Sequence, residues 1–197
     1  MQQENQNTFS IFEARQAFMK MRNSLERIVA TTPERLLSSR YGKAFGDIYT
    51  EATLGDIVAQ DFLGYIFKRG RENLVPENID LSMQWLILAA ANGNPLSLER
   101  LAIFLNSAYD EILRHPDFDY IKDKNNLTPD VFTPVVGKLI CEAIVDELGI
   151  SALKIIKEVP TELRFNNRTM NIYDNARNKV LPVVIKFLKG ENPYSEK

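Results

Sequence analysis

The sequence predicts an all-α protein, a short stack of antiparallel helix hairpins with additional helices at its N- and C-terminal ends. Apolar residues recur near the 3.6-residue helical repeat along most of the chain. No stretch shows the sustained two-residue alternation that is typical of a half-buried strand. A shift of 38 residues also brings two segments of similar pattern into register. These observations predict helices along most of the 197 residues and paired helices in the middle of the chain.

Residues 1–42 are predicted to form an N-terminal helical segment. Ser10 and Glu13 have the spacing of a capping box, which satisfies free amides at the start of a helix. Pro33 is expected to end this helix or to begin the next one. The apolar stripe of the segment consists of Phe9, Phe12, Phe18, Met21, Leu25 and Ile28.

Residues 43–114 form the predicted repeat region, with helices near 43–54, 57–69, 80–91 and 96–109 as successive antiparallel neighbours. The 38-residue shift aligns Ala59, Leu63, Gly64 and Phe67 with Ser97, Leu101, Ala102 and Leu105. Gly55 and Gly93 occupy matching turns, where glycine can adopt the left-handed conformation that closes a helix.

The helix predicted over 80–91 carries its small and apolar residues on one continuous stripe, formed by Ser82, Trp85, Leu86, Ala89 and Ala90. Gly64 removes a side chain where the preceding helix is expected to cross this stripe. Leu63 and Trp85 are therefore predicted to be buried. The positions assigned a structural role are Ala59, Leu63, Gly64, Trp85, Ala89, Ala90 and Gly93.

These residues resemble a known repeat. Ala59-x-x-x-Leu63-Gly64-x-x-Phe67-x-x-Gly70, followed by Ser82-x-x-Trp85 and Ala89-Ala90-x-x-Gly93-Asn94, is similar to the Sel-one-like repeat, a relative of the tetratricopeptide repeat. The resemblance covers one unit, about residues 59–94, with degenerate neighbours on both sides. It departs from the family pattern at Leu74, Asn78, Ser82 and Ser97 and in a longer loop. The resemblance implies stacked helix hairpins and a concave surface that binds protein segments.

The helix faces opposite the packing stripe are the candidate partner-binding surface. In the helix predicted over 57–69 these positions are Val58, Asp61, Tyr65 and Lys68. The 38-residue shift carries them to Leu96, Glu99, Ile103 and Asn106. Asp61 and Lys68 are predicted to be exposed. Tyr65 and Ile103 are apolar residues that need a cover. That cover is a partner segment, a second copy of the chain, or the N-terminal helix of the chain itself.

The rest of the chain is predicted to comprise a polar linker loop over 115–129 and a C-terminal helical segment over 130–197, all within one compact domain. Thr128-Pro129-Asp130 has the pattern of a helix start with proline in its first turn. Pro182 is expected to start, kink or break the last helix. The predicted apolar stripes are Val131, Val135, Leu139, Ala143 and Ile144, then Ala152, Leu153 and Ile156, then Ile172, Ala176, Val180, Val184 and Leu188.

We expect no catalytic residue, metal or cofactor. The sequence contains no P-loop, dinucleotide-binding, zinc-protease or serine-hydrolase motif. Asp117, Asp119 and Asp123 lack the glycine and final glutamate of a calcium loop, which indicates a solvated acidic loop. His115 has no second histidine in the chain, and Cys141 is predicted to be a small core residue.

The sequence therefore predicts a non-enzymatic adaptor or scaffold that binds protein partners through a helical-repeat surface. Residues 41–130 carry eight basic and fourteen acidic side chains, so no nucleic acid is expected there. The longest apolar run has seven residues and the first six residues are polar, which predicts a cytoplasmic protein without a membrane partner. The sequence does not exclude a homo-oligomer, nor an enzyme whose catalytic residues form no local motif. The main alternative is a regulatory protein that binds nucleic acid through its basic C-terminal part, at Arg164, Arg168, Arg177 and Lys179.

Overall fold

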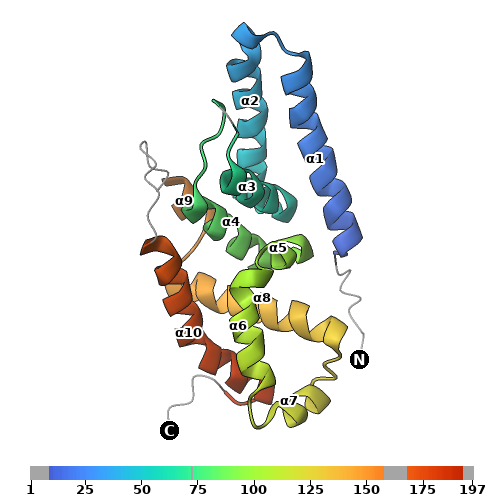
Figure 1. Cartoon of the computed structure of the whole chain (residues 1–197), viewed down its shortest axis with the longest axis vertical. Helices are drawn as coiled ribbons and strands as arrows, with labels where there is room; N and C mark the ends of the chain where they lie inside the picture. The colour runs from blue at the N-terminus through green and yellow to red at the C-terminus, as the bar shows by residue number, and fades with distance from the viewer. Residues whose placement is uncertain (1–8, 72, 158–167, 193–197) are drawn as a thin grey trace.

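The computed structural model describes residues 9–71, 73–157 and 168–192. Over these residues it forms ten α-helices and no strand, which confirms the all-α fold (Figure 1). The only β feature described there is one isolated antiparallel bridge between Arg71 and Val75. In chain order the helices are α1 (Ile11–Thr31), α2 (Glu34–Thr53), α3 (Ile57–Arg69), α4 (Ile79–Ala91), α5 (Pro95–Arg100), α6 (Ala102–Leu113), α7 (Phe118–Lys124), α8 (Pro129–Leu148), α9 (Ala152–Lys157) and α10 (Arg168–Lys189).

The first two helices, α1 and α2, form an antiparallel hairpin whose tip extends beyond the rest of the molecule (Figure 1). The predicted capping box is present, since the Ser10 hydroxyl accepts the Glu13 amide at 3.2 Å and the Glu13 carboxylate accepts the Ser10 amide at 2.8 Å. Pro33 separates the helices as expected. The helix predicted over 43–54 is the second half of the longer α2.

The α3–α4 pair has the close crossing that Gly64 predicts. A Cβ atom on Gly64 would lie 2.5 Å from Cγ of Leu86, so only glycine lets the two backbones approach this closely. The Ser82 hydroxyl donates a hydrogen bond to the Gly64 carbonyl at 2.7 Å, which joins the two helices at the same point. Leu63 and Trp85 are fully buried, as predicted.

The central helix is α4, which packs against α3, α5, α8 and α9. All residues from Leu81 to Ala91 are buried. The prediction of one buried stripe on this helix is therefore too narrow. A helix that is apolar all round is buried on every side, and the apolar run from Trp85 to Ala91 is the sequence signal of that environment.

The helix predicted over 96–109 is interrupted. The chain leaves helical geometry at Leu101, with φ −90° and ψ 1°, and this residue separates α5 from α6. As a result α6 does not continue the stack along α4; it runs down the molecule and packs against α8 and α10 (Figure 1).

The prediction of a linker loop over 115–129 is wrong, because its middle forms α7. Asp117 accepts an ion pair from Lys189 at 2.5 Å, and the Asn125 amide donates to the Leu188 carbonyl at 2.7 Å. Both contacts dock the segment on the end of α10. The single buried side chain of α7, Ile121, is too little for a periodic pattern to reveal the helix.

The apolar stripe predicted on α8 is displaced by one residue. The helix begins at Pro129 as expected, but Val131 and Val135 are exposed. Ile144 is buried as predicted, and the other buried positions are Phe132, Val136, Ile140 and Cys141.

The two last stripes are partly right. On α9, Leu153 is exposed and Ile155 is buried in its place. On α10, Ile172 is exposed and Tyr173 is buried, whereas the predicted core positions Ala176, Val180, Val184 and Leu188 are all buried. Pro182 lies inside α10, which neither starts nor breaks there.

Candidate interaction surfaces

Helix α1 of the same chain covers one residue of the predicted partner-binding face, Tyr65. Phe18 of α1 packs edge-on against Tyr65, with 5.0 Å between the ring centroids. The Arg100 guanidinium stacks on the Phe18 ring at 4.4 Å and lies 4.8 Å from the Tyr65 ring. The sequence left three possible covers for Tyr65, and in the structure the N-terminal helix is the one that lies over it.

The prediction that Asp61 is exposed is wrong. This side chain is fully buried, and its Oδ1 accepts hydrogen bonds from the Ser97 hydroxyl at 2.7 Å and from Nε of Arg100 at 3.0 Å. Burial raises the pKa of the Asp61 carboxyl, and the Arg100 guanidinium and the Ser97 hydroxyl oppose that shift. Asp61 therefore joins α3 to α5 inside the fold and offers nothing to a partner.

Other residues of the predicted face are scattered between core and solvent. Leu96 is buried, which corrects its assignment to the open surface, and Val58 is half-buried. Lys68, Ile103 and Asn106 are exposed, as a partner site requires. Ile103 is 89% exposed, but it lies on α6 beyond the reach of the α3 residues because the chain turns at Leu101.

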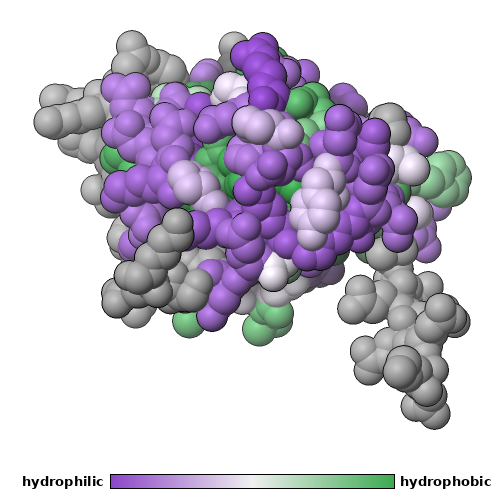
Figure 2. All heavy atoms as spheres, turned by 90° about the horizontal axis from the view of Figure 1, so that it is seen from below, coloured by the Kyte–Doolittle hydropathy of each residue, from purple (hydrophilic) through white to green (hydrophobic). Residues whose placement is uncertain are grey.

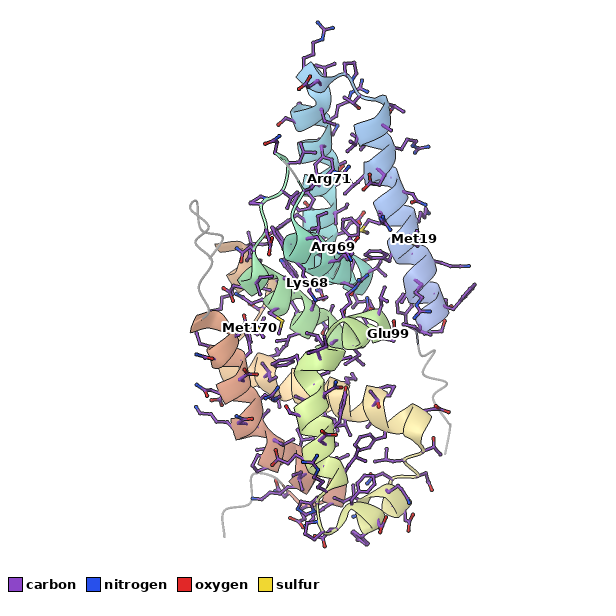
Figure 3. All side chains as sticks on the ribbon, in the orientation of Figure 1. Met19, Lys68, Arg69, Arg71, Glu99 and Met170 are labelled. Atoms are coloured by element: carbon purple, nitrogen blue, oxygen red, sulfur yellow. The ribbon has the colours of Figure 1, made fainter. Side chains whose placement is uncertain are left out.

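Two ion pairs hold α1 in place. Arg15 donates two hydrogen bonds to the carboxylate of Glu99, at 2.8 and 2.9 Å, and Figure 3 shows Glu99 beside the N-terminal half of α1. Farther along α1, Glu26 accepts two hydrogen bonds from Arg71, at 2.6 and 3.0 Å. Bidentate pairs of this kind fix orientation as well as adding energy, so α1 is positioned at two points along its length.

An open apolar groove lies between α8 and α10 and has a volume of about 500 Å³. Its floor is built from aliphatic side chains, and Phe187, which is 55% exposed, stands at its edge. The apolar lining consists of Leu139, Ala143, Val180, Val183, Val184 and Phe187. Val180 and Val184 are buried at its floor, whereas Leu139, Ala143, Val183 and Phe187 keep part of their apolar surface exposed.

Carboxylates line the same groove. Glu142, Asp146 and Glu147 belong to its lining, and no basic residue does. Lys138 pairs with Glu142 at 3.2 Å and Lys179 with Glu147 at 2.8 Å, whereas Asp146 has no ion pair within the described part of the chain. The groove therefore combines an apolar floor with an acidic margin.

The predicted but displaced stripe of α8 belongs to this surface. Leu139 and Ala143 line the groove, and Val135 and Val131 continue the same helix face at four-residue intervals, 37% and 43% exposed. Helix α8 is therefore apolar on an inward face, which joins the core, and on an outward face, which does not. The sequence signal was present, but it was assigned to the core.

Within the described residues, the two side chains considered for chemistry, Cys141 and His115, do not form a reactive site. Cys141 is fully buried, and burial raises the pKa of its thiol, which suppresses the thiolate. The Asp117 amide donates to Nδ1 of His115 at 3.2 Å, a contact within the turn before α7. Over the described residues no cluster of three or more histidine, cysteine or acidic side chains is placed to hold a metal ion.

The basic residues proposed for nucleic acid are partly engaged within the fold. Arg177 pairs with Asp174 at 3.3 Å and stacks on Phe104, 5.1 Å from the ring centroid. Lys179 pairs with Glu147. Arg164 and the side chain of Arg168 lie outside the described residues. The two basic residues of this cluster whose side chains are described, Arg177 and Lys179, are therefore each neutralised by an acidic neighbour.

Charge is separated between the two ends of the molecule. Residues 20–43, at the tip of the α1–α2 hairpin, carry six basic and two acidic side chains, a net charge of +4. Residues 106–147 carry four basic and nine acidic side chains, a net charge of −5. Seen from the end opposite the hairpin tip, the surface is largely hydrophilic, with only small hydrophobic areas (Figure 2).

Comparisons with models of known protein families, with curated proteins and with solved structures found no match. The resemblance to Sel-one-like repeats therefore stays a prediction that rests on the residues quoted for it. None of the described helices is both long enough and apolar enough to cross a bilayer.

Proposed function

We propose that this chain is a non-enzymatic adaptor that binds a segment of a partner protein in the groove between α8 and α10. The observation that supports it is the groove itself, an apolar trough of about 500 Å³ with Phe187 at its edge. Apolar grooves of this size on helical proteins suit the apolar face of another helix. The adaptor function is the one the sequence predicts, but the surface differs, because α1 covers Tyr65 and because Asp61 and Leu96 of the predicted face are buried.

The partner segment is an amphipathic helix with aliphatic or aromatic anchors and basic flanks. Its anchors would contact Ala143, Val183 and Phe187, where apolar surface remains exposed. Lysine or arginine on its flanks would face Asp146, because Glu142 and Glu147 are already paired with Lys138 and Lys179. Charge complementarity of this kind selects partners and speeds association more than it adds affinity.

A photo-crosslinking experiment tests this proposal in cells of the source organism. The photoreactive residue benzoylphenylalanine replaces Val183 in the groove in one full-length variant, and Leu153 on α9 in the control. Leu153 is 65% exposed and does not line the groove. We expect the Val183 probe to capture a partner that the Leu153 probe does not, and the crosslinked peptide to be basic and amphipathic.

Additional substitutions show whether the captured segment sits in the groove. Phe187→Ser in the Val183-probe chain should reduce the crosslinked product about tenfold, whereas Ile172→Ser on the same helix should leave it unchanged; Ile172 is exposed and lies outside the groove lining. Identical captures by the two probes, or no capture, would contradict the proposal. A crosslink to a second copy of the chain would replace the partner with a homo-oligomer.

A further inference from the structure

A second pocket lies between α1 and α2, in the basic hairpin. Its volume is about 390 Å³, which is in the range of small-ligand sites. Each helix contributes residues at positions i, i+3, i+4 and i+7, so two helix faces meet across the pocket. The residues used below are Ser24, Arg27 and Thr31 from α1 and Arg40, Lys43 and Asp47 from α2.

Positive charge faces positive charge across this pocket. Arg27 lies on α1, and Arg40 and Lys43 lie opposite it on α2. Like charges near one another repel, although these three side chains are exposed and solvent screens part of that repulsion. Asp47 is the only acidic residue in the lining, so the pocket keeps a net charge of +2.

Among the described residues, some cations near the hairpin are paired and others are not, and Lys20, Arg22 and Arg35 share the unpaired state without lining the pocket. Arg15 and Arg71 are each held by a glutamate in a two-bond ion pair. Arg27, Arg40 and Lys43 have no ion pair within the described residues, although Asp47 lines the same pocket. The fold thus assembles three uncompensated cations around a hollow.

We propose that the pocket between α1 and α2 binds a small phosphate ester. A phosphate monoester carries a charge of about −1.5 to −2, which neutralises the net positive lining. Guanidinium groups on both helices supply the planar donors that suit phosphate oxygens, and the Ser24 hydroxyl supplies a neutral donor. The Asp47 carboxylate accepts a hydroxyl or amino group of the same ligand, so an organic phosphate fits the lining better than inorganic phosphate.

Calorimetric titration of the full-length chain tests the proposal with three probes: inorganic phosphate, glucose 6-phosphate and adenosine monophosphate. We expect at least one of the two esters to bind more tightly than inorganic phosphate. Amide chemical-shift changes on adding the tighter ester should concentrate between residues 24–31 and 40–47. Binding by none of the probes at millimolar concentration, tighter binding of inorganic phosphate, or shift changes centred elsewhere would overturn the proposal.

Charge-removing variants locate the site. Arg40→Gln should weaken the ester about tenfold or more, because a charge-assisted hydrogen bond is lost. Arg35→Gln removes the same charge from the same helix outside the pocket lining, and should change affinity less than about twofold. Equal weakening by the two variants would indicate diffuse attraction and would refute a built site. Arg35 and Arg40 are both exposed, and a thermal melt of each variant verifies that it is folded.

Discussion

The α3–α4 pair and the α8–α10 pair bury their shared seams in different ways. In α3–α4 a glycine at the crossing lets the backbones approach, and every residue of α4 from Leu81 to Ala91 is buried. In α8–α10 valines line the seam and a groove stays open. The glycine of α8, Gly137, lies against Tyr109 and Leu98 instead, so it faces α6 and α5 and not α10.

The two seams differ in the position of the small residue and in the helices that form them. Helix α4 carries one charged residue among 13, whereas α10 carries six among 22. Where glycine faces the neighbouring helix, the side chains interlock and water is excluded. In the α8–α10 pair, where it faces elsewhere, apolar surface stays available to a partner.

The largest test of the contrast compares one aromatic residue from each pair. Trp85→Ala removes a fully buried side chain from the α3–α4 pair and should lower the free energy of unfolding by about 3–5 kcal/mol. Phe187→Ala removes a half-exposed ring from the α8–α10 pair and should cost below about 1 kcal/mol. Urea unfolding measures both. Similar losses would mean that the groove is closed in solution.

Glycine substitutions test the crossing directly. Gly64→Ala places a methyl group against Leu86 and should destabilise the fold by about 1–3 kcal/mol. Gly46→Ala, in the middle of α2 with nothing within 4 Å of the added atom, should stabilise it by about 0.5–1 kcal/mol. A neutral Gly64→Ala variant in thermal or urea unfolding would show that the α3–α4 crossing is looser than described.

The pH dependence of the free energy of unfolding tests the burial of the Asp61 carboxyl on α3. Its pKa is raised in the folded chain, chiefly by burial, so protonation favours the folded state. Its contribution to stability is present at low pH and is lost as pH rises through the folded pKa. The difference in free energy of unfolding between the wild type and Asp61→Asn should therefore fall as pH rises above the ordinary pKa of an aspartate, about 4.

Asp117 provides a control of opposite sign. The hydrogen bond from Lys189 lowers the pKa of the Asp117 carboxyl in the folded chain. Its contribution is present above the unfolded pKa and is lost as pH falls through the folded one. The difference between the wild type and Asp117→Asn should accordingly rise with pH. Parallel slopes for the two variants in urea unfolding would contradict these assignments.

The smallest expected effect belongs to the ion pair that attaches α1. Arg15 and Glu99 are 59% and 48% exposed, and exposed pairs of this kind contribute about 0–1 kcal/mol. Glu99→Gln should therefore change the free energy of unfolding by less than about 1 kcal/mol, with any loss disappearing in high salt. A loss of several kcal/mol in urea unfolding would mean that the Arg15–Glu99 ion pair, and not the packing of Phe18, holds α1 over Tyr65.

The sequence predicted the α3–α4 pair well because the pair is periodic and its key contacts are short-range in the chain. Gly64 and Leu86 lie in adjacent helices, and Gly55 and Gly93 have the positive φ values, 101° and 93°, that the turns require. The turn at Leu101 and helix α7 lack such signals. Leu101 is an ordinary helix former, and α7 is stabilised by docking on the end of α10.

The candidate surfaces were less predictable, because they depend on contacts between distant parts of the chain. Arg15 and Glu99 are 84 residues apart, and no local pattern shows which of three covers lies over Tyr65. The burial of Asp61 depends on Ser97 and Arg100, more than 30 residues away. On α8 two apolar stripes lie side by side, and only the position of the neighbouring helices decides which one is the core.

The burial of α4 on every side has a consequence for how the molecule opens. Helices from before it, α3, and from well after it, α8, both pack on its surface, so neither half of the chain completes the core without the other. Amide hydrogens in such a helix exchange with solvent mainly when the whole domain unfolds. The α1–α2 hairpin packs on α3, and α10 packs mainly on α8, so neither element belongs to the helices that pack closely on α4. Local opening at either one is therefore compatible with an intact centre, and the protein would respond to its ligands at the periphery while its slowest-exchanging helix stays protected.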